Sequence, residues 1–203
     1  MKKIILAASV AACAIAAQAN AQSANFTGPR VQLDAGYDQL DANDDYPDLP
    51  RHFDTAYLAA TLGYDVAIAP GIVAGAEVGF GKPLGGSRHV ALGSDALTVS
   101  PGREWTGAVR LGANVTPSTL LFGTAGYSNA GISAVFDSPG LPGGDRTRIE
   151  GSKGGFLWGV GAEQAIAGKA FASLAFRSAH YGNYNYQHGV KRTQIRLGLG
   201  VRF

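Results

Sequence analysis

Hydrophobic and polar residues alternate along most of the chain, starting just after Gly28 and Pro29. In residues 31–38 the odd positions are apolar and the even positions are polar or glycine. This period of two is typical of a β-strand whose two faces meet different surroundings. Seven more segments alternate, so eight strands are predicted. The apolar positions of the eight fall within residues 31–37, 56–68, 72–80, 105–115, 121–127, 156–162, 174–176 and 195–203.

The connections between the predicted strands alternate in length. The tight turns lie at residues 69–71, 116–119 and 167–169. The longer loops lie at residues 41–52, 82–102, 129–153 and 182–190. Short periplasmic turns and long outer loops are typical of outer-membrane barrels. The sequence therefore predicts an all-β fold, namely an eight-stranded antiparallel transmembrane up-and-down β-barrel.

The polar face of the predicted strands separates a membrane barrel from a soluble one. A soluble barrel exposes that face to water and fills it with Lys and Glu, whereas a narrow membrane barrel encloses it. Here the face is dominated by small residues, namely Gly36, Gly63, Gly75, Gly79, Gly112, Gly159, Gly161, Gly198, Gly200, Ala59, Thr61, Thr106 and Thr124. We therefore expect the apolar face to contact lipid and the polar face to line the lumen.

The composition agrees with strands that cross a membrane. Charged residues make up 16% of the chain, well below the usual quarter, and 29 residues are glycine. Beyond the N-terminus, no apolar run reaches the ~18 residues that a membrane-spanning helix requires. Low charge and abundant glycine therefore favour a barrel.

The first residues resemble an export signal. Lys2 and Lys3 precede an apolar stretch, residues 4–17, and Ala19-Asn20-Ala21 supplies a small-x-small cleavage site. We predict a signal peptide at 1–21 and a barrel at 22–203. An alternative is lipoprotein processing at Val10-Ala11-Ala12-Cys13. Cleavage after residue 21 removes the only cysteine and two of the 17 basic residues, leaving 15 against 15 acidic ones. A nucleic-acid partner is therefore not expected.

Three segments resemble the OmpA-type, opacity-protein-like family of small outer-membrane barrels, a porin-related group. They are LLFGTAGY at 120–127, FLWGVGAE at 156–163 and RLGLGVRF at 196–203. The resemblance implies an eight-stranded barrel in the bacterial outer membrane, inserted by the barrel-assembly machinery. That machinery reads a C-terminal strand whose signal here comprises Ile195, Leu197, Leu199, Val201 and Phe203.

Charged residues on the polar face are predicted to meet inside the lumen, because placing them in lipid is costly. They are Asp34, Asp65, Glu77, Arg110, Glu163, Arg177 and Arg196. One interpretation is a structural ion-pair cluster that fills a barrel too narrow for a channel. The other is a gate whose ion pairs exchange partners to admit ions.

Aromatic residues on the apolar face lie toward the strand ends, where membrane interfaces favour amphipathic rings. The predicted girdle comprises Tyr37, Tyr64, Phe80, Trp105, Tyr127, Phe156 and Trp158. A ligand-stacking platform is the alternative interpretation.

Sites for metals or catalysis are weakly indicated. Asp41, Asn43 and Asp45 match the start of a calcium loop, but Tyr46 and His52 replace its essential Gly and Glu. A solvated loop is therefore favoured over weak divalent binding. No metal or cofactor is predicted.

Histidines and serines offer no better case for chemistry. The four histidines, His52, His89, His180 and His188, lie in or beside outer loops without the spacing of a metal site. Ser178 and His180 invite comparison with a serine–histidine lipid-A deacylase, but no carboxylate orienter is evident. No catalytic residue is predicted.

These observations predict an integral outer-membrane protein that is not an enzyme. We expect a structural or surface-interaction role through the long extracellular loops, with outer-membrane lipid and lipopolysaccharide as partners. The alternatives are a narrow porin-like channel gated by lumenal ion pairs and, third, a lipid-A-modifying enzyme.

Overall fold

The computed structural model describes residues 23–41, 52–92, 95–138, 145–182 and 190–203. The predicted signal peptide, 1–21, lies outside the described residues. The elements are the short helix η2 (Ser23–Phe26) and the strands β1 (Gly28–Asp41), β2 (His52–Ala69), β3 (Ile72–Pro83), β4 (Arg88–Leu92), β5 (Asp95–Thr116), β6 (Thr119–Ser138), β7 (Asp145–Ala167), β8 (Ala170–Tyr181) and β9 (Val190–Arg202). Among the described residues, no helix is long and apolar enough to cross a membrane.

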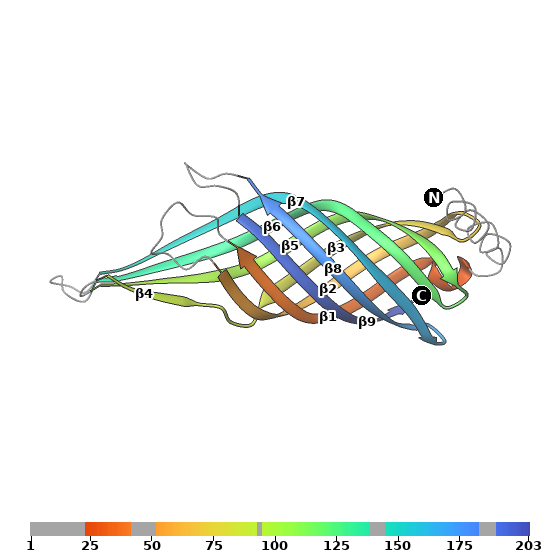
Figure 1. Ribbon diagram of the computed structural model, residues 1–203, viewed down its shortest axis with the longest axis horizontal. Helices are drawn as coiled ribbons and strands as arrows, with labels where there is room; N and C mark the ends of the chain where they lie inside the picture. The colour runs from red at the N-terminus through yellow and green to blue at the C-terminus, as the bar shows by residue number, and fades with distance from the viewer. Residues whose placement is uncertain (1–22, 42–51, 93–94, 139–144, 183–189) are drawn as a thin grey trace, which may run out of the picture.

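Eight of these strands form a closed antiparallel ring (Figure 1). The hydrogen-bonded order runs β3-β2-β1-β9-β8-β7-β6-β5, and β3 also pairs with β5, which closes the sheet. β4 pairs only with β5 and lies outside the ring. The predicted all-β, eight-stranded antiparallel architecture is therefore confirmed.

The two faces of the ring have opposite chemistry. Large apolar side chains are exposed on the outside: Leu33, Leu197 and Leu199 are 66–67% exposed. Charged side chains such as Asp65 and Arg196 are 1–2% exposed and point inward. This arrangement inverts that of a water-soluble protein, because apolar surface is stable outside only where the surroundings are also apolar. The apolar face therefore contacts lipid, as predicted.

The tight turns lie together at one end of the ring, which we call the turn side. They join β2 to β3, β5 to β6 and β7 to β8. Gly71 and Gly168 have positive φ angles of 72° and 55°, which side chains rarely tolerate. The start of β1 and the end of β9 lie at the same end, since Arg30 pairs with Arg202. The opposite end is the loop side.

Two of the predicted loops are largely strand. Residues 82–102 contain β4 and the start of β5, and residues 129–153 contain the end of β6 and the start of β7. The loops were predicted because these segments lie between the alternating runs. However, Ala130–Ser138 forms nine consecutive pairs with Asp145–Lys153. Backbone hydrogen bonding along such a hairpin outweighs the local turn signals. The other two predicted loops, 41–52 and 182–190, lie mostly outside the described residues.

These extended strands form a sheet beyond the ring, which we call the arm (88–92, 95–103, 129–138 and 145–154). The pairing of β3 with β5 ends at Gly81 and Glu104, and the pairing of β7 with β8 ends at Gly155 and Tyr181. Beyond these levels β4 to β7 continue to pair with one another. Figure 1 shows the arm projecting at the end opposite the C-terminus and the start of β1. Nine residues of extended strand span roughly 30 Å.

Candidate functional site: the charged barrel interior

The ring encloses an unusual number of charged groups. Among the described residues, six carboxylates and six guanidinium groups are each less than 9% exposed. The carboxylates are Asp34, Asp38, Asp65, Glu77, Glu104 and Glu163, and the guanidinium groups belong to Arg30, Arg110, Arg177, Arg192, Arg196 and Arg202. The numbers balance, so this set is electrically neutral. Burial of charge at this density requires pairing.

The first ion-pair layer lies near the turn side, and Asp65 and Glu163 are its centre. Arg202 bridges the two, donating to Asp65 at 2.8 Å and to Glu163 at 2.6 Å. Arg110 approaches the same pair from β5, at 2.7 Å from Glu163 and 3.9 Å from Asp65. The carboxylates therefore share their cations, which links β2, β5, β7 and β9.

Glu77 extends this turn-side layer to three more strands. It forms ion pairs with Arg30 of β1 and with Arg177 of β8. Arg30 also donates to Asp65 at 2.9 Å. The turn-side layer thus joins β3 to β1 and β8 through side chains, although β3 pairs with neither of them in the sheet. These contacts across the lumen stabilise one register of the strands in the ring.

A second ion-pair layer lies near the loop side and centres on Glu104. The Glu104 carboxylate accepts hydrogen bonds from Ser128 at 2.6 Å, Tyr57 at 2.7 Å and Gln194 at 3.1 Å. The guanidinium groups of Arg196 and Arg192 lie 3.4 Å and 3.6 Å from the same carboxylate. Glu104 therefore contacts β2, β6 and β9, and it neutralises part of the charge on β9.

Asp38 completes this loop-side layer. Arg192 donates to Asp38 through two nitrogens, at 2.7 Å and 2.6 Å, and Gln194 donates to it at 3.1 Å. This two-point contact between planar groups is the strongest geometry for such a pair. It joins β1 to β9 inside the lumen, in addition to the backbone hydrogen bonds between these two strands.

Neutral polar groups separate the two layers. Asp34 accepts hydrogen bonds from Gln32 and from Thr61, the latter at 3.3 Å, and Gln32 also donates to Ser173 at 3.0 Å. Asp34 therefore meets amide and hydroxyl donors rather than a guanidinium. The predicted single cluster is in fact two layers, with Asp34 and its uncharged hydrogen-bond donors between them.

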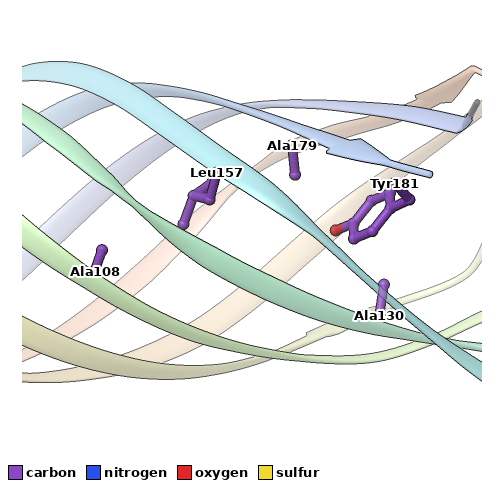
Figure 2. Close-up of a cluster of buried hydrophobic side chains, with 5 residues drawn as sticks. All are labelled: Ala108, Ala130, Leu157, Ala179 and Tyr181. Carbon is purple, nitrogen blue, oxygen red and sulfur yellow. The ribbon is translucent and has the colours of Figure 1, made fainter.

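Buried apolar side chains close the turn side of the charged interior and pack between strands toward the loop side. On the turn side, Phe26, Val73 and Leu120 form a buried cluster, and Arg202 donates to the Phe26 carbonyl at 2.9 Å. The loop-side cluster comprises Ala108, Ala130, Leu157, Ala179 and Tyr181 (Figure 2). Figure 2 shows the Tyr181 ring lying across the interior between strands. Its hydroxyl is 2.8 Å from Ser128, which ties this cluster to Glu104.

The seven lumenal residues predicted from the sequence are all buried, but the structure distributes them. Five lie in the turn-side layer, Arg196 lies in the loop-side layer, and Asp34 lies between. Five partners were not predicted, namely Arg30, Asp38, Glu104, Arg192 and Arg202. Asp38 and Arg202 lie on the polar face inside the predicted strands, and Arg30, Glu104 and Arg192 lie one to three positions beyond a predicted strand end. Following the period of two through these positions would have found all five.

The predicted aromatic girdle lies on the outer surface. Its seven members are 39–59% exposed. Phe80 and Trp105 pack against each other with ring centroids 4.6 Å apart, and Trp158 and Phe176 do so at 5.7 Å. The apolar residues of the C-terminal strand, from Ile195 to Phe203, are also exposed on the outer surface.

The residues considered for chemistry do not assemble into a site. The Ser178 side chain is buried, and its hydroxyl has no hydrogen-bond partner, so His180 does not bond to it. Within the described ranges, no three His, Cys, Asp or Glu residues are placed to hold a metal ion. His188 and the acidic segment 42–51 lie outside the described residues.

Comparisons with known proteins agree with this architecture. The structure is similar to neisserial surface protein A (NspA), with a TM-score of 0.56 and 15% identity over 87% of this chain and 98% of that one. It is also similar to a major outer membrane protein from Thermus thermophilus (TM-score 0.51, 12% identity, 85% and 99% coverage). Ail, the attachment invasion locus protein of Yersinia pestis, gives 0.50 and 16% identity over 87% and 99% of the two chains.

At these identities the similarity to solved structures shows the fold alone. A search of curated protein sequences found no match. The family model for the outer membrane protein beta-barrel domain, however, matches residues 5–203. Together with the closed ring, its lipid-facing exterior and its ion-paired interior, this match shows that the chain belongs to the outer membrane protein beta-barrel domain family.

Proposed function

We propose that the protein is a non-conducting anchor in the outer membrane that holds the arm at the cell surface for contact with other surfaces. The main evidence for this proposal is the arm, because three strands continue for many residues after the ring ends. A barrel needs only strands of about 9–11 residues to cross the membrane. β5, β6 and β7 contain 22, 20 and 23 residues, about twice that length.

The interior supports an anchoring role. The two ion-pair layers and the two buried apolar clusters fill the lumen with side chains from all eight ring strands. Opening a path would separate buried partners such as Arg202 and Glu163, at a cost of about 3–5 kcal/mol for each broken pair. Such an interior is suited to a rigid support.

The surface chemistry of the arm suits transient contacts. Its outermost hairpin exposes Arg146, Arg148, Ile149 and Glu150. Charges along an unpaired strand edge oppose uncontrolled pairing between sheets while leaving polar groups free to bind. Three of these four exposed side chains are charged, and Ile149 is the large apolar one.

A trimmed variant tests this function. Residues 132–151 are replaced by an Asn-Gly turn, and Leu84 is joined to Gly102 through a short glycine linker, so that the ring keeps all its pairs. Cells that display the intact protein or the trimmed variant are compared for adhesion to glycan-coated surfaces and for autoaggregation. The proposal expects the trimmed barrel to reach the membrane in equal amount and to lose most of the contact. Unchanged adhesion and aggregation would contradict it.

A gated channel is the second candidate, and one observation favours it. Several buried polar atoms of the turn-side layer have no hydrogen-bond partner, including Asp65 Oδ1, Arg110 Nε and both Nε and Nη1 of Arg177. Unused donors and acceptors lower the barrier to a second arrangement of the ion pairs. Planar-bilayer recordings of the wild type and of Arg110→Ala distinguish the two functions. Steady single-channel steps from the wild type would show that the protein is a channel rather than a non-conducting anchor.

A further inference from the structure

A groove on the outer wall lies immediately beyond the barrel and carries a cluster of cations. It has a volume of about 520 Å³ and is lined by outward-facing residues of β3, β5, β6 and β7. Lys82, Arg103 and Arg148 supply positive charge, and Glu150 supplies the one negative charge among the lining residues. The groove therefore has an excess of two positive charges and lies on the outside of the protein, separate from the lumenal layers.

Small residues hollow this groove. Gly102, Gly131, Gly151 and Ser152 line it, and the two large rings at its lower end leave its centre open. A β-bulge between Pro101 and Glu104 shifts the pairing of β5 with β6 at this level. Bulges bend the strand and redirect side chains. This one places Arg103 on the exposed wall beside Gly131, whose Cβ position would lie 3.5 Å from the Arg103 carbonyl.

The groove begins where the lipid-facing surface ends. Its lower rim is Phe80 and Trp105, whose rings pack at 4.6 Å and belong to the outer aromatic level. In the pairing of β3 with β5, these two residues are opposite each other. Lys82 follows Phe80 by two positions, and Arg103 precedes Trp105 by two, so both cations lie one step further from the membrane on the same face. Aromatic rings mark the interface between hydrocarbon and headgroups.

The cations of the groove are available to a ligand. Within the described part of the chain, neither Lys82 nor Arg103 has an acidic partner within ion-pair distance. Arg148 pairs with Glu150 at 2.8 Å, but both side chains are about two-thirds exposed, at 64% and 66%. An exposed pair of this kind contributes little energy, so an incoming anion can compete for the guanidinium.

We infer that this groove binds the phosphorylated headgroup of a glycolipid of the outer leaflet. The cations would hold phosphate, for which guanidinium and ammonium groups are suited. Asn129, Ser133 and Ser152 would offer hydrogen bonds to sugar hydroxyls, and the rings of Phe80 and Trp105 would contact the first part of the acyl chains. A water-soluble anion would use the cations alone. The continuous change from aromatic to cationic surface matches an amphiphile that already lies in the membrane.

This inference depends on membrane insertion but not on adhesion by the arm, so the two proposals can fail separately. It is tested with the refolded barrel in zwitterionic detergent micelles. Trp105 and Trp158 are the two tryptophans of the chain, so Trp158→Phe leaves the groove residue as the only reporter. Bis-phosphorylated lipid A is titrated while Trp105 fluorescence is recorded. Dephosphorylated lipid A, phosphatidylglycerol and inorganic phosphate are titrated in parallel.

The expected result is saturable binding of bis-phosphorylated lipid A, at least tenfold tighter than of each of the other three. The double substitution Lys82→Ala with Arg103→Ala should weaken it tenfold or more. Arg146→Ala with Lys169→Ala removes two exposed cations outside the groove and should change it less than twofold. Gly131→Leu fills the groove without changing its charge and should also weaken binding. Heat-modifiability on gels verifies that each variant is folded.

Three results would overturn the inference. Equal binding of phosphatidylglycerol would reduce the groove to a general anionic-lipid surface, and equal binding of inorganic phosphate would show that no lipid is required. Either result overturns the inference on the wild type alone, whatever the variants do. Equal weakening by the two double substitutions would likewise overturn it, because net charge rather than the groove would then govern binding.

Discussion

The hydroxyl of Tyr57 on β2 donates a 2.7 Å hydrogen bond to the carboxylate of Glu104 on β5, across the barrel interior. β2 and β5 do not pair in the sheet, because β3 lies between them. Gly81 of β3 makes the contact possible. A Cβ atom at this position would lie 1.7 Å from the Tyr57 hydroxyl. A missing side chain on one strand therefore allows a polar contact between its two neighbours.

Removing the Glu104 carboxylate is expected to destabilise the barrel more than removing an exposed one. Glu104→Ala leaves Arg192, Arg196 and the Tyr57 hydroxyl without their shared acceptor, and breaking a buried pair costs about 3–5 kcal/mol. Glu150→Ala breaks an exposed pair and should cost no more than about 1 kcal/mol. Urea unfolding in lipid vesicles, followed by the gel shift of unheated samples, measures each free energy. Equal losses would show that the loop-side layer contributes no net stability.

Two glycines of neighbouring strands should differ sharply in their tolerance of alanine. Gly81→Ala must displace the buried Tyr57 side chain and its bond to Glu104, and overpacking of this kind costs about 1–3 kcal/mol. At Gly107 a Cβ atom meets nothing within 4 Å, so Gly107→Ala should be neutral or slightly stabilising. The same unfolding measurement compares them. Similar destabilisation by both substitutions would contradict the packing argument.

The arm and the tight turns should lie on opposite sides of the membrane. With Cys13 replaced by Ser, Ile149→Cys in the arm should react with a membrane-impermeant maleimide on intact cells, since Ile149 is 65% exposed. Lys169→Cys, in an exposed tight turn, should react only after the outer membrane is permeabilised. The reverse pattern would mean that the barrel is inserted in the opposite orientation.

The last residue should matter for assembly more than for final stability. Phe203 is 64% exposed and packs against little besides the Lys169 ammonium, 5.8 Å from the ring centroid. If the barrel-assembly machinery reads the C-terminal strand, Phe203→Ala lowers the amount of folded barrel in the outer membrane. The purified, refolded variant should unfold at nearly the wild-type urea concentration. Normal assembly of the variant in cells would contradict the prediction that the C-terminal strand carries the assembly signal.

Some of the barrel's strands were easier to predict than others, and the reason lies in the interior. The alternation is clear in β1 and β9, where inward Asp34 and Arg196 contrast with outward Leu33 and Leu197. It is weak in β8, where the inward residues include Phe171, Ala175 and Ala179. These line apolar parts of the lumen, so both faces of the strand are apolar and the period of two is hidden.

The sequence by itself determined the strand faces, because the side-chain period of a strand requires Asp65 and Leu62 to point to opposite sides whatever their partners. It also determined the tight turns, since a turn is decided by a few adjacent residues. Only the tertiary structure decided which charges meet. Arg192 and Asp38 are 154 positions apart, and their contact depends on closure of the ring and on the register of every strand. The arm and its groove also became visible only in the tertiary structure, because backbone pairing among β4 to β7 formed strand in segments that were predicted to be loops.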